Sequence, residues 1–225
     1  MRDDGTLESE NWSGYAVTGS SFTEAKGSWT VPTVNCSLTP GTYSSFWVGL
    51  DGYSSSTVEQ TGTDSDCNGS RPSYYAWYEF YPNPSELIRN LTISPGDQMS
   101  AEVSYSGGEF TITITDETTG QSHTKISRVS GAARSSAEWI AEAPCCTRGG
   151  GILPLSDFGT VSLGGDSTHV SGTNFATDSS TSGSISVFGS SVDQITMVSS
   201  KGANEAVPSA LSADGTSFTV AWKSE

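Results

Sequence analysis

Positively charged residues are scarce in this chain. Lys and Arg number 10 against 25 Asp and Glu, which gives a formal net charge of −15 at pH 7. Proteins that bind nucleic acid neutralise phosphates with clustered cations, and anionic membrane surfaces attract the same groups. The sequence therefore predicts neither a nucleic-acid partner nor a membrane partner.

Histidine is also rare, which removes several kinds of catalytic site. The two histidines, His123 and His169, both stand in polar, turn-like segments. A Ser-His-Asp triad needs one of them, and there is no GxSxG segment to carry the serine. HExxH is absent, as are the Asp-Thr-Gly and Asp-Ser-Gly triplets of two-aspartate acid proteases. With no His cluster at metal spacing, we expect no metal and no cofactor.

The four cysteines are Cys36, Cys67, Cys145 and Cys146, and no CxxC pair occurs among them, so a zinc site is not expected. Cys36 and Cys67 are candidates for a bridge between two loops. Cys145 and Cys146 are adjacent, and a bond between neighbours is strained. Free thiols or bonds elsewhere therefore stay open for that pair. The cysteine usage is compatible with an oxidising compartment.

Long hydrophobic runs are missing, so neither a signal peptide nor a membrane-spanning segment is predicted. Residues 1–10 are polar and charged, and we expect a flexible N-terminal segment there. The pI near 4.3 brings the net charge toward zero in acid, where self-repulsion of the compact chain is small. This composition suits work in acid, although acidic proteins of neutral compartments share it.

Ser, Thr and Gly are abundant, while β-branched and aromatic residues come in short runs without a helical period. Turn dipeptides such as Asp51-Gly52, Pro95-Gly96 and Gly107-Gly108 recur along the chain. Many short strands with frequent turns predict an all-β sandwich or barrel. No shift in composition marks a linker, so residues 11–225 are predicted to form one domain. The 22 Phe, Trp and Tyr residues supply large side chains for its core.

Three predicted strands carry aromatic and acidic residues on the same face. Side chains alternate across a strand, so one face of residues 46–51 holds Trp47, Gly49 and Asp51. By the same alternation, Tyr75, Trp77, Glu79 and Tyr81 share a face in one further strand, and Glu138, Ile140 and Glu142 in another. Exposed rings beside carboxylates indicate a binding groove. The alternative is a sheet buried on both faces with acids at the strand ends.

Carboxyl and carboxamide chemistry remains after these exclusions. Hydrolysis of a peptide bond needs a base for water, a donor for the oxyanion and an acid for the leaving nitrogen. One Glu can serve first as base and then as acid. A Gln amide is a neutral donor that keeps its hydrogen-bonding ability at any pH.

Several segments, in order and at matching spacing, carry a family resemblance. They are Asn11-Trp12-Ser13-Gly14, Trp47-Val48-Gly49-Leu50-Asp51-Gly52, Val58-Glu59-Gln60-Thr61-Gly62, Ala76-Trp77-Tyr78-Glu79-Phe80-Tyr81-Pro82, Ile93-Ser94-Pro95-Gly96-Asp97, Ala137-Glu138-Trp139-Ile140-Ala141-Glu142 and Asp157-Phe158-Gly159-Thr160-Val161. Through them the chain resembles the glutamic peptidases, or eqolisins.

That resemblance implies an antiparallel β-sandwich of two roughly seven-stranded sheets, of the concanavalin-like jelly-roll kind, with a groove on one concave face. It also implies a secreted, monomeric, acid-acting endopeptidase with a polypeptide substrate, whose leader and propeptide are absent from this sequence. Gln60 matches the catalytic glutamine, and Glu142 matches the catalytic glutamate. The positions expected to line or support the groove are Trp12, Trp47, Asp51, Asp64, Trp77 and Glu79.

The chain departs from the family pattern at Tyr75, where an acidic groove residue is expected, and after Glu142, where Cys145 and Cys146 replace further acids. We also consider that Glu79 raises the pKa of Glu142 by like-charge repulsion. Two alternatives remain: a glycoside hydrolase that pairs Glu142 with Glu138 or Glu79, and a carbohydrate-binding module. Sequons occur at Asn11-Trp12-Ser13 and Asn90-Leu91-Thr92.

Overall fold

The structure is a computed structural model that describes residues 6–145 and 151–225. It is almost entirely β, as the turn-rich sequence predicts. The strands are β1 Leu7–Ser9, β2 Trp12–Thr18, β3 Glu24–Thr30, β4 Ser45–Leu50, β5 Val58–Asn68, β6 Arg71–Tyr81, β7 Glu86–Leu87, β8 Gln98–Ser106, β9 Glu109–Asp116, β10 Gln121–Ser127, β11 Ser136–Glu142, β12 Thr160–Leu163, β13 Phe175–Thr177, β14 Ser182–Ser184, β15 Val192–Val198, β16 Asn204–Pro208 and β17 Phe218–Trp222. The short helix α1 spans Gly165–Thr168, and the 3-10 helix η1 spans Ile185–Ser191.

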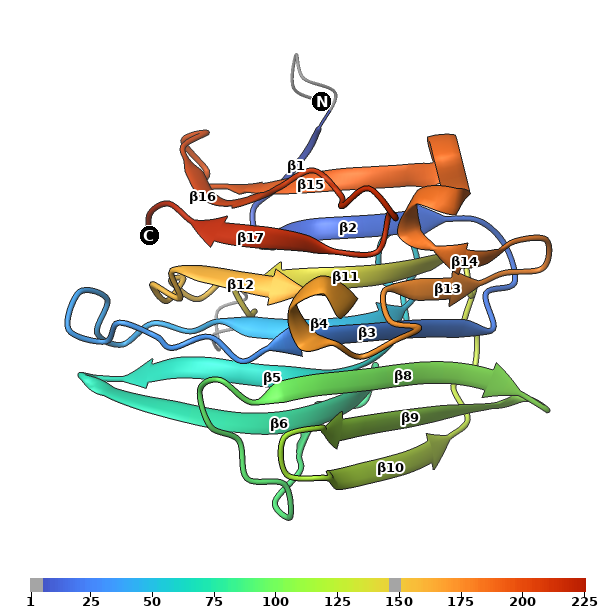
Figure 1. Cartoon of the computed structure of the whole chain (residues 1–225), viewed down its shortest axis with the longest axis horizontal. Coiled ribbons are helices and arrows are strands. Elements are labelled where there is room, and N and C mark those ends of the chain that lie inside the picture. Colours follow the sequence, from blue (N-terminus) through green and yellow to red (C-terminus); the bar gives the residue numbers. More distant parts are fainter. Residues whose placement is uncertain (1–5, 146–150) are drawn as a thin grey trace.

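Two layers of strands face each other (Figure 1). One layer runs β7-β6-β5-β4-β11-β2-β15-β1, and every pairing in it is antiparallel except that of β1 with β15. The other contains β10-β9-β8-β3, with β12 and β13 beside β3 and β17 beside β12. Strand β16 pairs with both β15 and β17, so the sheets are joined along one side.

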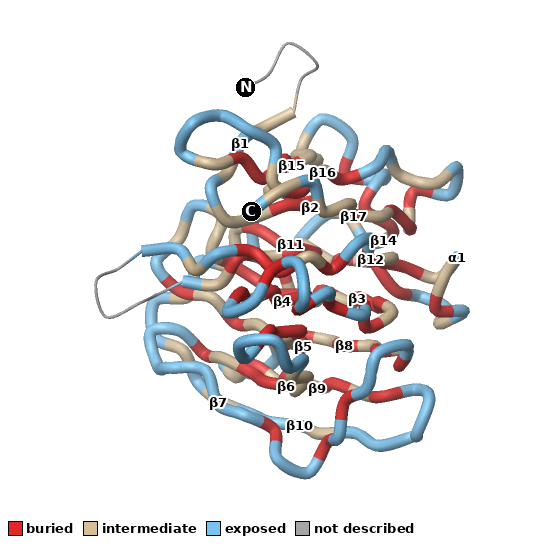
Figure 2. Tube along the Cα trace, turned by 90° about the vertical axis from the view of Figure 1, so that its left-hand side faces the viewer, coloured by how far each residue is buried: buried red, intermediate tan, exposed pale blue. Residues whose placement is uncertain are grey.

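The main core fills the space between the layers. Phe46, Val48 and Leu50 on β4 belong to it and are fully buried. The buried segments follow the strands, while the exposed segments are mostly loops (Figure 2). Trp47 points the other way, into a second cluster with Trp77 and Ile140 on the outer face of the first sheet. The face assignment from the sequence is therefore confirmed for these strands, because alternation sends every second side chain away from the core.

A disulfide links Cys36 to Cys67, with a Cα–Cα distance of 5.2 Å. Cys67 lies within β5 rather than in a loop, so the bridge ties the end of this strand to the segment between β3 and β4. Among the described residues no cysteine is free. Cys145 is among the described cysteines, so it is not free. Cys146 lies outside the described residues, and the pairing of these two cysteines therefore stays a prediction from the sequence.

The predicted flexible segment of residues 1–10 requires a correction. Leu7–Ser9 form strand β1, which pairs in parallel with β15 through Leu7–Ile195 and Ser9–Met197. Only residues 1–5 of that segment lie outside the described part of the chain. Backbone hydrogen bonds to β15 hold this segment, and the polar, charged side chains of the segment do not predict that pairing. Within the described ranges no helix is long and apolar enough to cross a membrane.

Candidate active site

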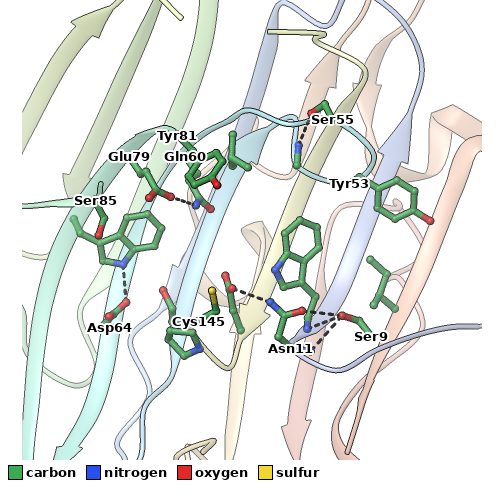
Figure 3. Close-up of a pocket in the computed structure, with 18 of the residues that line it drawn as sticks. Ser9, Asn11, Tyr53, Ser55, Gln60, Asp64, Glu79, Tyr81, Ser85 and Cys145 are labelled. Atoms are coloured by element: carbon green, nitrogen blue, oxygen red, sulfur yellow. Dashed lines mark hydrogen bonds between the residues drawn. The ribbon is translucent and has the colours of Figure 1, made fainter. Parts of the chain in front are cut away.

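A groove of about 900 Å³ lies on the outer face of the first sheet (Figure 3). Strands β1, β2, β4, β5, β6, β7, β11 and β15 contribute to it, together with the loop after β4 and the segment after β11. Gln60 and Glu142 both line this groove, and both are half-buried. Two side chains 82 positions apart in the sequence therefore face the same space.

The strand register explains how these two side chains face one groove. Glu142 pairs with Ser45 across β11 and β4, whereas Gln60 pairs with Gly49 across β5 and β4. Between these two rows, Gly62 pairs with Trp47. A Cβ at Gly62 would lie 2.6 Å from the Trp47 Cβ, so only glycine leaves room for the indole there. The Trp47 ring consequently forms a buried floor between the two rows.

Hydrogen bonds from neighbouring N–H groups hold the Glu142 carboxylate. Trp47 Nε1 donates to Oε2 at 2.6 Å, and Asn11 Nδ2 donates to Oε1 at 3.1 Å. Burial raises the pKa of Glu142 to about 7, and the nearby Asp64 adds to the rise, while the Trp47, Trp12 and Asn11 donors oppose it. The group is therefore oriented as a hydrogen-bond acceptor and also holds its proton more tightly than an ordinary Glu.

The Gln60 amide is oriented by Glu79. Gln60 Nε2 donates to Glu79 Oε2 at 2.6 Å, and the two residues are register partners on β5 and β6. Gln60 Oε1 has no hydrogen-bond partner among the described residues. One N–H of the amide thus binds Glu79, which leaves the second N–H to donate to a bound molecule.

A second pair of carboxyl groups lies next to this site. Asp64 Oδ1 accepts a hydrogen bond of 2.6 Å from Trp77 Nε1, and Asp66 Oδ2 accepts one of 2.7 Å from the Tyr75 hydroxyl. Burial raises the pKa of Asp64 to about 7 and that of Asp66 to about 6. Asp64, Ser45 and Glu142 form one row across three strands, so a charge on Asp64 acts on Glu142 over a single small residue.

Comparison with known proteins identifies the family. The model of the Peptidase A4 family matches residues 10–208. The chain belongs to this family. It is 33% identical over 178 residues to aspergillopepsin-2 of Aspergillus niger and 37% identical over 143 residues to scytalidopepsin B of Scytalidium lignicola. These matches cover 69% and 61% of the chain, but only 62% and 52% of the two relatives.

A Peptidase A4 fold is also evident in three dimensions. A crystal structure of scytalido-glutamic peptidase with a transition state analog inhibitor superposes with a TM-score of 0.76 at 24% identity. The match covers 95% of this chain and 98% of that one. The predicted antiparallel sandwich and the predicted glutamic peptidase family are thus both confirmed.

Four residues expected in the groove line it: Trp12, Asp64, Trp77 and Glu79. Two others do not. Trp47 is fully buried and acts through its indole N–H on Glu142. Asp51 is also fully buried, and its carboxylate accepts hydrogen bonds from Arg134 N at 2.6 Å and Ser135 N at 2.9 Å. Of the two roles expected for Asp51, lining or supporting the groove, these hydrogen bonds favour support, because they fix the loops beside the groove.

Two positions in the structure bear on the alternatives. Glu138 is fully buried and neither of its carboxylate oxygens has a hydrogen-bond partner among the described residues, so it does not pair with Glu142 around a sugar. Buried Trp47 offers no stacking platform to a carbohydrate. Glu79 binds Gln60, and the carboxyl group that raises the pKa of Glu142 is Asp64 rather than the predicted Glu79. These positions disfavour both rival functions in this Peptidase A4 protein.

Some residues of the groove were missed by sequence reasoning. Asn11 binds Glu142 directly, and Tyr53 lines the groove from the loop after β4. Asn11 belongs to the family-like segment Asn11-Trp12-Ser13-Gly14, which marks this part of the chain as important. The segment alone does not predict that the Asn11 amide contacts Glu142. Tyr53 sits in a serine-rich loop in which Gly52 N donates to Ser55 Oγ at 2.9 Å and Thr57 Oγ1 donates to Asp51 Oδ2 at 3.5 Å.

Replacing Asp64 by Asn should make Glu142 easier to ionise. The substitution removes a carboxyl group that raises the pKa of Glu142, so the pKa should fall toward the ordinary value of 4.5. In the pH profile of kcat/KM for peptide cleavage, we expect the acidic limb to move to lower pH. An Asp157→Asn variant, far along the chain in the segment before β12, should leave the limb in place. A limb at the wild-type pH in Asp64→Asn would contradict this coupling.

Proposed function

We propose that this chain is an endopeptidase that hydrolyses peptide bonds with Gln60 and Glu142. The observation that supports the proposal most strongly is that these two side chains line one groove while separate partners hold each of them. The groove has a volume of about 900 Å³. Among the described residues that line it there is no Lys, Arg or His.

In the proposed mechanism the ionised Glu142 takes a proton from a water molecule, which attacks the carbonyl carbon of the peptide bond. The same group then donates that proton to the leaving nitrogen, so that it is regenerated as a carboxylate. General acid–base catalysis of this kind contributes roughly 10²–10⁴-fold to a rate. The step needs no metal and no cofactor.

Gln60 stabilises the negative charge that develops on the oxygen of the peptide carbonyl. Its Nε2 donates one hydrogen to Glu79, and its second hydrogen is directed to the oxyanion that forms on the peptide carbonyl. A donor fixed before the reaction costs no reorganisation when charge develops. Glu79 therefore acts by orienting the amide, which agrees with its position opposite Gln60 in the sheet.

Two opposing effects set the working pH. The ionised fraction of Glu142 grows as the pH rises toward about 7. The fold, however, keeps protons on several buried carboxyl groups and loses stability over the same range. We infer that activity is greatest in weakly acidic medium, and that the protein works as a secreted monomer on unfolded or loosely folded polypeptides.

A single assay tests the reaction class. Denatured protein and glucans are incubated with the chain across the acidic range, with and without EDTA and pepstatin. Cleavage of the protein that neither inhibitor prevents is the expected result. Release of sugar, or peptide cleavage that EDTA or pepstatin abolishes, would refute the proposal.

Replacing Gln60 by Ala should lower turnover far more than binding. Loss of one oxyanion donor typically reduces kcat by about 10²–10³-fold, because the donor acts on charge that exists only in the transition state. We expect kcat to fall by that factor and KM to stay near the wild-type value in steady-state assays on a fluorogenic peptide. Gln121→Ala, at an exposed position on β10, is the matched control. A wild-type kcat in Gln60→Ala would exclude Gln60 as the donor.

A further inference from the structure

A short chain of hydrogen bonds leads from the N-terminal strand to Glu142. Asn11 stands in the turn between β1 and β2, and its Nδ2 donates to Glu142 Oε1 at 3.1 Å. The side chain is half-buried at the wall of the groove (Figure 3). Its amide thus contacts the carboxylate oxygen that Trp47 leaves free.

Ser9 governs which end of the Asn11 amide faces Glu142. The Ser9 hydroxyl donates to Asn11 Oδ1 at 3.1 Å and accepts from Asn11 N at 3.3 Å and Trp12 N at 3.1 Å. With Oδ1 occupied by the hydroxyl proton, Nδ2 turns toward the carboxylate. If the amide were reversed, its oxygen would meet Glu142 Oε1 and repel the ionised form.

The backbone on either side holds this arrangement in place. Ser9 belongs to β1, whose parallel pairing with β15 sets it opposite Met197. The Asn11 carbonyl accepts a hydrogen bond of 2.9 Å from Ala143 N, the residue after Glu142. Trp12 is itself the register partner of Glu142 across β2 and β11. These contacts therefore join the turn to the end of β11.

Among the described residues, the groups that stabilise the charge on Glu142 are neutral. The other acidic and tyrosine residues described in the groove lining are Glu8, Tyr53, Asp64, Tyr75, Glu79 and Tyr81, and no positively charged residue is among the described lining. On the strands packed against it, Ser45 and Trp47 of β4 and Trp12 of β2 face Glu142, and Asp64 of β5 lies beyond Ser45. Each N–H donor consequently has a direct influence on how easily the group ionises.

We propose that Asn11 is a positioning residue for Glu142 and that the Ser9 hydroxyl sets the orientation of its amide. This inference rests on the proposed function, because it concerns the ionised Glu142 as the base. Ser9 and Asn11 together keep an N–H directed at the Glu142 carboxylate, which favours the charged form. Asn11 binds Oε1 while Trp47 binds Oε2, so both oxygens are held in place. Both residues act through Glu142, and neither is proposed to contact the substrate.

The same asparagine begins the sequon Asn11-Trp12-Ser13. A glycan on Nδ2 would replace a hydrogen that Glu142 needs and would fill the groove wall. The active form therefore carries an unmodified Asn11, and the experiment below uses protein from a bacterial host without N-glycosylation.

The test is the pH profile of kcat/KM for a fluorogenic peptide, with the melting temperature as a fold control. In Asn11→Ala we expect the acidic limb to move up by about half a unit to one unit, because one N–H donor to a charged group is lost. Asn11→Asp should move it further, since a like charge replaces the donor. Ser9→Ala should give a smaller rise, and Ser9→Thr, which keeps the hydroxyl, should restore the wild-type limb. Asn90→Ala, in the exposed second sequon, is the matched control.

An unmoved limb in both Asn11→Ala and Ser9→Ala would overturn the proposal, as would a uniform loss of kcat/KM at every pH, which indicates a structural role. If Asn11→Ala does not fold, Asn11→Asp and Ser9→Ala decide in the same way. The experiments distinguish a failure of the proposed function from a failure of this inference. Wild-type activity in Glu142→Gln contradicts the function itself, whereas an inactive Glu142→Gln with unmoved limbs in the Asn11 and Ser9 variants contradicts only this inference.

Discussion

Replacing Glu142 by Gln should abolish peptide cleavage while the fold survives. The amide has nearly the shape of the carboxyl group, but it cannot take a proton from water at any accessible pH. Because one residue serves as base and then as acid, we expect kcat to fall by roughly 10⁴-fold, the upper end of the range for proton-transfer catalysis. The amide oxygen can still accept one hydrogen bond, from either Trp47 or Asn11.

The measurement is the initial rate on denatured protein, followed by mass spectrometry of the products, together with circular dichroism. Glu86→Gln, at an exposed position on β7, provides a control with the same chemical change. Substantial residual cleavage by a folded Glu142→Gln protein would refute the assignment. Unfolding of the variant would instead be seen directly in the spectrum, and Glu142→Asp, which keeps an acid but shortens its reach, would then decide.

Replacing Glu59 by Leu should free the fold from its dependence on acid. Glu59 is fully buried in β5, with Leu50 and Phe80 as its register partners on the core face. Neither of its carboxylate oxygens has a hydrogen-bond partner among the described residues. Burial raises the pKa of Glu59 from 4.5 to about 8, and the neighbouring Asp51 adds to the rise. The group is thus a neutral acid in a hydrophobic core.

The sign of the effect follows from proton linkage. The folded state keeps the proton of Glu59 up to about pH 8, whereas the unfolded chain releases it near 4.5. Stability is therefore fully present below that lower value and is lost as the pH rises through the interval. A shift of this size corresponds to roughly 5 kcal/mol of unfolding free energy at the upper end. Leucine has no proton to lose, so this loss should vanish in the variant.

Urea unfolding at a series of pH values checks the prediction. The free energy of unfolding of Glu59→Leu should exceed that of the wild type by an amount that grows from acid to neutral pH. Glu86→Gln should follow the wild-type curve. Parallel curves for the wild type and Glu59→Leu would show that the buried carboxyl group does not limit stability. Glu138, whose pKa burial also raises well above 4.5, offers a second test through Glu138→Gln.

These two predictions describe different limits on activity. Glu142 needs to lose its proton for catalysis, whereas Glu59 and Glu138 need to keep theirs for the fold. In Glu59→Leu the acidic limb of the rate profile should stay where it is, because its side chain points into the core and Glu142 faces the groove. Only the upper pH limit of activity should change in Glu59→Leu, and it should move to higher pH.

Much of the site was predictable from strand alternation. The pattern Phe46, Val48 and Leu50 against Trp47 separates the core face from the groove face, and the structure confirms it. The same alternation places Glu59 opposite to Gln60, on the core face. A charged residue in that position contradicts the expectation for a core, and only its neutral form removes the conflict.

Other features depended on how strands meet. Asp51 continues the groove face by count, but the chain turns at this residue, which has φ of 66°, and loop amides capture its carboxylate. Ser9 lies in the polar segment predicted to be flexible, and Asn11 follows it, yet β1 pairs with β15, Ser9 binds Asn11 and Asn11 binds Glu142.

The sequence by itself determined the all-β class, the faces of the central strands, the family and the two residues proposed for catalysis, because alternation and short motifs are local properties of the chain. Only the tertiary structure decided that Glu142 takes its donors from Trp47 and Asn11, that Asp64 is its acidic neighbour, and that Asp51 supports loops. Those facts depend on which strands pair and in what register. Pairing is chosen by the burial of whole sheets and not by any one segment.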